Sequence, residues 1–70
     1  MVHKANQIAL FFAGYTRDEA IDGVATHLRL YWEPRMRRQI VDFVAAGATE
    51  SLHEYALEAV KRLALETSSR

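Results

Sequence analysis

Apolar residues recur every three to four positions along most of the chain, and no stretch alternates between apolar and polar residues as a β-strand does. At about 100° per residue, this spacing predicts helices over residues 3–13, 17–31 or 32, and 34–46, with a fourth following Ser51. The sequence therefore predicts an all-α fold, a small bundle of four short helices.

The apolar residues of each predicted helix gather on one side, which we expect to face the core. These residues are Ala5, Ile8, Ala9, Phe11, Phe12 and Tyr15; Ala20, Ile21, Val24, Ala25, Leu28, Tyr31 and Trp32; Met36, Ile40, Phe43 and Val44; and Leu52, Ala56, Ala59, Val60 and Leu63. Leu10 and Leu30 lie off these faces, and the apolar arc of the fourth helix is wider than one neighbour needs to cover. Small monomers seldom expose so much apolar surface, so the pattern predicts a second contact surface.

Capping residues mark the helix boundaries: two S/T-x-x-E capping boxes and two glycine stops, namely Thr16 with Glu19, Ser51 with Glu54, Gly14 and Gly47. Proline suits the first position of a helix, and its ring pushes the residue before it out of the helical region. Pro34 therefore predicts a sharp corner after Trp32 and Glu33. Gly23, inside the second helix, indicates either the close approach of another helix or a tolerated weak spot.

The stretch HLRLYWEPRMRR, residues 27–38, places a large aromatic residue and a basic cluster at this corner. The cluster is Arg35, Arg37 and Arg38, in a first helical turn where the helix dipole disfavours each cation by about 0.3–1 kcal/mol. We interpret it as a contact surface for an anionic partner; the alternative is a solvated face on which Arg38 pairs with Asp42. The candidate partner-binding residues are Trp32, Arg35, Arg37, Arg38, His27, Leu30 and Leu10.

Seventy residues allow one domain, which we place at residues 1–66 with a disordered tail at 67–70. The formal net charge of zero argues against non-specific nucleic-acid binding as the main role. The lack of cysteine excludes disulfides and thiolate metal sites. No apolar run approaches the ~18 residues that span a bilayer, and no signal-peptide pattern opens the sequence, so we expect no membrane partner and a cytoplasmic location.

The usual catalytic patterns are missing: there is no phosphate-binding loop, no H-E-x-x-H and no cysteine nucleophile. His3, His27 and His53 fall in three separate segments without metal-ligand spacing. We therefore predict no catalytic, cofactor-binding or metal-binding residue. A small DNA-binding regulator is the alternative function, because arginines open a helix after a tight corner as in a helix-turn-helix; the proline corner and zero net charge oppose it.

The stretches KANQIALFFAGY and GVATHLRLYWEPRMRRQIVDFVAAG resemble the delta subunit of soluble, molybdenum-containing, NAD-dependent formate dehydrogenases. The similarity covers residues 3–47 and includes Asn6-Gln7-Ile8 with Phe11-Phe12, then His27, Trp32, Pro34, Arg35, Met36 and Arg37. The resemblance implies partner subunits that carry the molybdenum cofactor, iron–sulfur clusters and FMN and that reduce NAD⁺. It also implies no redox centre in the delta subunit itself.

The resemblance and the residues together predict a non-catalytic accessory subunit that supports assembly, stability or molybdenum-cofactor loading of the catalytic subunit. Its expected partner is the large (alpha) subunit of formate dehydrogenase. Apolar surface left open without that partner predicts a homo-oligomer when the chain is isolated.

Overall fold

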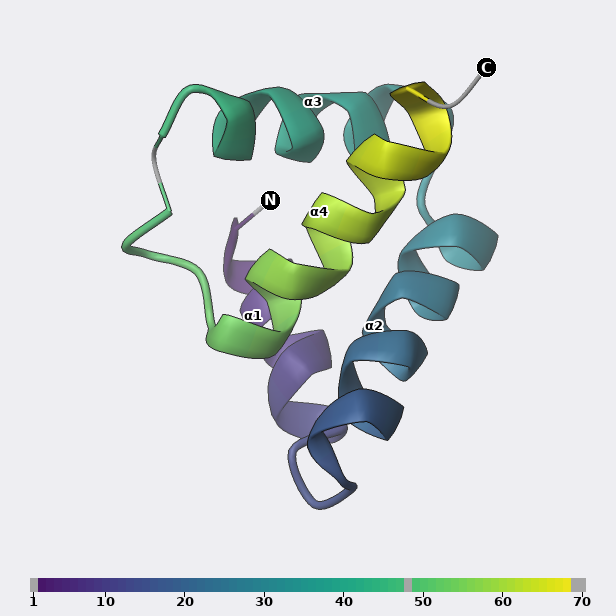
Figure 1. Cartoon of the computed structure of the whole chain (residues 1–70), viewed down its shortest axis with the longest axis vertical. Coiled ribbons are helices and arrows are strands. Elements are labelled where there is room, and N and C mark those ends of the chain that lie inside the picture. Colours follow the sequence, from purple (N-terminus) through teal and green to yellow (C-terminus); the bar gives the residue numbers. More distant parts are fainter. Residues whose placement is uncertain (1, 48, 69–70) are drawn as a thin grey trace.

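The computed structural model describes residues 2–47 and 49–68. Within them the chain forms four helices and no strand, which confirms the predicted all-α fold class: α1 (Val2–Phe11), α2 (Arg17–Tyr31), α3 (Pro34–Ala45) and α4 (Glu54–Ser68) (Figure 1). α2 and α4 make the most extensive contact, α1 packs against both, and α3 crosses one end of the bundle against α4. α4 includes Thr67 and Ser68, two residues of the predicted disordered tail; the other two lie outside the described residues.

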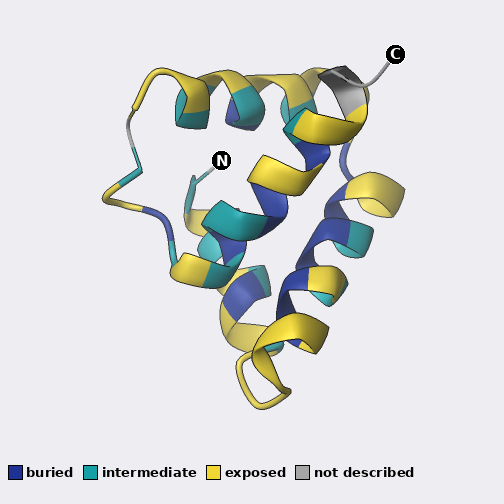
Figure 2. Cartoon of the chain, viewed as in Figure 1, coloured by how far each residue is buried: buried dark blue, intermediate teal, exposed yellow. Residues whose placement is uncertain are grey.

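The core lies between α1, α2 and α4 and is closed by α3, with buried positions facing inward on every helix (Figure 2). Burial of a large aliphatic side chain contributes about 1.5–3 kcal/mol. Alanines at the contacts let the helix backbones approach closely. The largest fully buried side chains are Ile21, Leu28, Ile40, Val24 and Val60, and the buried alanines are Ala5, Ala9, Ala20, Ala25, Ala56 and Ala59.

Three aromatic residues that were predicted to face the core are instead exposed to solvent. Phe11 is 75% exposed, Tyr15 56% and Tyr31 72%. Phe11 and Tyr31 are the last residues of α1 and α2, and α1 meets its neighbours mainly through small side chains, so its buried face is narrower than its apolar face. The other predicted core residues are buried or half-buried, which confirms the remaining core faces.

The helix ends confirm two of the four capping predictions, the box at Thr16 and the stop at Gly47. Thr16 and Glu19 form the predicted capping box: the Glu19 N–H donates to Thr16 Oγ1, and the Thr16 N–H donates to Glu19 Oε1. Gly47 adopts φ +91° after α3, the left-handed conformation that closes a helix. α1 ends at Phe11, two residues before the predicted end, because the chain tightens there into turns in which the Ala13 and Tyr15 N–H groups each bond the carbonyl three residues before them. Gly14 therefore takes no positive φ.

The predicted capping box at Ser51 does not form, and α4 begins at Glu54. The Asn6 side chain holds the preceding loop against α1: its Nδ2 donates to the Ser51 carbonyl oxygen at 2.8 Å, and its Oδ1 accepts the His53 N–H at 2.7 Å. His53 then caps the helix, because its Nδ1 accepts the Tyr55 N–H at 3.0 Å. The loop tether, not the local capping pattern, decides where α4 starts.

Ion pairs also join the outer sides of α2 and α4. They are Arg17 with Glu54 at 2.9 Å, Arg29 with Glu66 at 2.6 Å and Arg62 with Asp22 at 3.8 Å. The hydrogen bond to the Glu54 carboxylate raises the pKa of the Arg17 guanidinium, which stays protonated in any case. Because all six side chains are exposed, water screens the pairs, and each adds little to stability.

Gly23 marks a close approach, as the first of the two alternatives held, but what approaches is the side chain of Phe12, just after α1, and not another helix. A Cβ atom at this position would lie 2.6 Å from Cε1 and 2.7 Å from Cδ1 of the Phe12 ring. The half-buried ring therefore rests directly on the α2 backbone. The absence of a side chain at position 23 is what allows the segment after α1 to pack this closely on α2.

We predict that the effect of Gly23→Ala on the free energy of unfolding changes sign with the residue at position 12. Alanine favours a helix by about 1 kcal/mol over glycine. In the parent chain its methyl group displaces the Phe12 ring, so the net effect is a loss of about 1 kcal/mol in the free energy of unfolding. In a Phe12→Ala background the same substitution stabilises. Urea denaturation of the parent chain, the two single variants and the double variant measures both effects. An effect of equal sign in both backgrounds would contradict the packing described.

A second prediction concerns the loop tether. Asn6→Ala removes two hydrogen bonds between α1 and the loop before α4, each contributing about 0.5–1.5 kcal/mol. The free energy of unfolding therefore falls by about 1–3 kcal/mol. Gln7→Ala is the matched control, since Gln7 is exposed and its side chain makes no hydrogen bond within the described residues. Equal losses for the two variants would show that the tether does not stabilise the fold.

Candidate partner-binding surface

The corner between α2 and α3 is made by two extended residues. Trp32 caps α2 with φ −89° and ψ 139°, and Glu33 follows with φ −63° and ψ 150°, as the proline ring requires. Pro34 then opens α3. Trp32 is only 8% exposed, so most of its ring belongs to the core. The aromatic residue of the predicted contact surface is thus mainly the anchor of the corner.

Arg37 turns back from α3 to the carbonyl end of α2. Its Nη1 donates to the carbonyl oxygens of Trp32 and Arg29, both at 2.7 Å, and approaches that of Leu28 at 3.4 Å. The last carbonyls of a helix have no partner within it and carry partial negative charge. The positive charge of Arg37 is unfavourable in the first turn of α3, its own helix. It is favourable at the carbonyl end of α2, where it binds.

Arg35 and Arg38 differ from Arg37 because both are exposed and neither makes a hydrogen bond or ion pair within the described residues. The alternative pairing of Arg38 with Asp42 is likewise not formed there. Arg38 and Asp42, but not Arg35, line a groove of about 490 Å³ between the start of α3 and the end of α4. Arg29 and Glu66, joined by two hydrogen bonds of 3.1 and 2.6 Å, lie on its opposite side.

The remaining candidates lie on α1 and α2. His27 is half-buried and contacts Tyr31 in a tilted arrangement, with ring centroids 4.9 Å apart. It lines a groove together with Trp32 and Phe11. Leu10 and Leu30 are 63% and 69% exposed, as the helical pattern predicted. Leu65 on α4 is also exposed; its place at the edge of the broad apolar arc is the sequence signal that could have identified it.

The structure thus divides the seven predicted residues by location. Arg35 and Arg38 form one basic surface, His27 and Trp32 line a separate groove, and Leu10 and Leu30 project singly into solvent. Arg37 is occupied by the backbone of α2. Sequence reasoning did not anticipate this role, although an arginine three residues after a proline corner is well placed to reach the helix before it.

Within the described parts of the chain, no three His, Asp or Glu side chains are grouped so that they could hold a metal ion. No helix there is long and apolar enough to cross a membrane.

A family model described as the delta subunit of NADH-dependent formate dehydrogenase matches residues 1–60 of the chain. This match includes both resembling stretches and the start of α4 up to residue 60, less than half of that helix. No curated protein matches the chain, and no solved structure does.

We predict that Arg37 and Arg35 differ sharply in their effect on stability. Arg37→Ala leaves carbonyls at the end of α2 without their charged donor and lowers the free energy of unfolding by about 1.5–3 kcal/mol. Arg35→Ala has almost no effect or stabilises slightly, because it removes a cation from a helix N-terminus. Chemical denaturation followed by circular dichroism compares the two variants. Similar losses at both positions would refute the structural role of Arg37.

Proposed function

Since the chain belongs to the family of NADH-dependent formate dehydrogenase delta subunits, we propose that it is a non-catalytic accessory subunit. It supports assembly, stability or molybdenum-cofactor loading of the catalytic subunit, and the large (alpha) subunit is its partner. Family membership also favours this role over the DNA-binding regulator.

The observation that carries the proposal is a pair of arginines at a rigid corner, neither of which has a partner among the described residues. Arg35 and Arg38 project from the first turn of α3, which Pro34 and Arg37 fix relative to α2. Arginine is enriched at interface hot spots because its guanidinium combines contact area with directed donors. A carboxylate or phosphate on the large subunit pairs with these donors and also meets the positive end of the α3 dipole.

The redox chemistry belongs, on this proposal, to the other subunits of a cytoplasmic complex. These carry the molybdenum cofactor, iron–sulfur clusters and FMN and transfer electrons from formate to NAD⁺. The present chain has no cysteine to hold an iron–sulfur cluster. Its contribution is a surface of fixed shape and charge. The exposed Leu65, which lines one apolar surface with Val41, Val44 and Ala64, supports the further proposal that the isolated chain forms a homo-oligomer.

The function is tested by reversing the charge of the basic surface. Arg35→Glu with Arg38→Glu should leave the melting temperature unchanged or slightly raised, because acids suit a helix N-terminus. Affinity for formate dehydrogenase prepared without this chain should fall by about 2 kcal/mol or more, the effect expected of hot-spot residues. Formate dehydrogenase activity in cells should fall through poor assembly, with the KM for formate unchanged.

Lys61→Glu with Arg62→Glu is the matched control, since it changes the net charge equally at exposed positions on α4. The control variant should bind as the parent chain does. If the variant at positions 35 and 38 also binds and supports activity as the parent chain does, the arginines are only a solvated face.

A further inference from the structure

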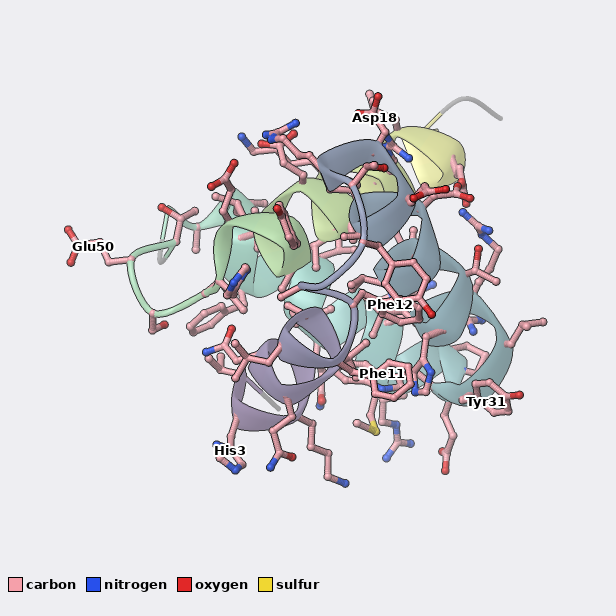
Figure 3. The ribbon with its side chains drawn as sticks, turned by 90° about the horizontal axis from the view of Figure 1, so that it is seen from below. His3, Phe11, Phe12, Asp18, Tyr31 and Glu50 are labelled. Atoms are coloured by element: carbon pink, nitrogen blue, oxygen red, sulfur yellow. The ribbon has the colours of Figure 1, made fainter. Side chains whose placement is uncertain are left out.

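A second surface, separate from the basic corner, lies between α1 and α2. We call it the aromatic groove: Lys4, Gln7, Ile8 and Phe11 of α1 line it together with His27 and Trp32 at the end of α2. Its volume is about 400 Å³, enough for two or three large side chains. Tyr31 does not line the groove but contacts His27, with ring centroids 4.9 Å apart. Figure 3 shows Phe11 and Tyr31 projecting from the two helices in the same part of the view.

The rings around the groove are held in place before any partner arrives. Phe11 meets the Phe12 ring edge-on with centroids 5.1 Å apart, and Phe12 rests on the Gly23 backbone. Trp32 is buried, and its carbonyl oxygen is bound by Arg37. Aromatic side chains with few rotatable bonds and fixed positions lose little entropy on binding. The exposed rings therefore form a preorganised apolar surface.

The charges at the groove indicate what it accepts. Lys4 and His27 are its only ionisable lining residues, no carboxylate lines it, and Lys4 has no ion pair within the described residues. In a two-fold symmetric pair of copies, the same patch would meet itself, bringing Lys4 and His27 of each copy together without a compensating acid. A segment that brings both apolar side chains and a carboxylate is complementary to the groove, whereas a second copy of it is not.

We propose that the aromatic groove receives an amphipathic, acidic segment of another formate dehydrogenase subunit. Its large aliphatic side chains fill the groove beside Phe11 and His27, and its carboxylate pairs with Lys4. The inference rests on the proposed function and adds a second contact to that of the basic corner. The two contacts lie on different elements, α1 and α2 with Trp32 for the groove and α3 for the arginines.

Site-directed photo-cross-linking in the assembled enzyme tests the proposal. Phe11 or Tyr31 is replaced by p-benzoylphenylalanine, an aromatic residue that suits both exposed positions, and the linked peptides are identified by mass spectrometry. The matched control carries the same residue in place of Leu65, which is 70% exposed on α4 and does not line the groove. We expect positions 11 and 31 to link to one segment of another subunit, containing large aliphatic residues and at least one acid, and position 65 not to reach that segment.

Cross-links from positions 11 and 31 only to a second copy of this chain, to a segment without those residues, or to nothing in a complex that still assembles would each overturn the groove proposal alone. Failure of the unmodified chain to co-purify with formate dehydrogenase would overturn the proposed function and this inference with it. The two failures are therefore distinguishable.

A charge variant supplies an independent measurement. Lys4→Glu lies in the first turn of α1, where an acid does not weaken the helix, so the variant folds. We expect its affinity for formate dehydrogenase prepared without this chain to fall by about tenfold, because two acids then face each other. Lys61→Glu is the control and should not change that affinity. Unchanged binding by Lys4→Glu would show that no acidic partner meets the groove.

Discussion

The contact of Arg37 with the carbonyl end of α2 is the interaction on which the geometry of the corner depends. A single guanidinium nitrogen bonds the carbonyl oxygens of Arg29 and Trp32 and thereby ties the first turn of α3 to the last turn of α2. It gives a charged donor to groups that have no partner within their own helix. It also fixes Trp32, whose ring closes the core on one side and lines the aromatic groove on the other.

At each connection between helices, a side chain bonds backbone groups that have no partner within a helix. A chain of this length buries only about 60% of its unfolded surface, so its apolar core alone leaves a narrow margin of stability. Asn6 tethers the loop before α4, Thr16 caps α2, and Arg37 closes the corner. Each contact satisfies backbone groups and defines the direction of the next helix. The surfaces on these helices are held in fixed positions without cysteine or, among the described residues, a grouped metal site.

The fixed positions of these surfaces suit the accessory role that we propose for the chain. On our proposal, the chain presents a cationic surface from α3 and an apolar, weakly cationic groove from α1 and α2. His27 and Trp32 at the end of α2 line the groove, and Arg37 bonds the start of α3 to the same helix end. The end of α2 therefore sets the spacing between the two surfaces. Two contacts fixed in this way cooperate in binding, because forming the first raises the effective concentration of the second. On the same proposal, it is through this geometry that a non-catalytic subunit supports a large enzyme.

The sequence by itself determined the helices, most of the core and the ends at Thr16, Pro34 and Gly47, because periodicity and capping depend on residues within one or two turns. It also placed the candidate site at the corner. Only the tertiary structure decided that Arg37 serves α2 while Arg35 and Arg38 remain open, since that depends on how two helices cross. Only the tertiary structure showed that Phe11 and Tyr31 are exposed to solvent. It also showed that α4 begins at Glu54, after a loop held by hydrogen bonds from Asn6 to residues 45 and 47 positions away. Contacts between residues so distant in sequence leave no local pattern.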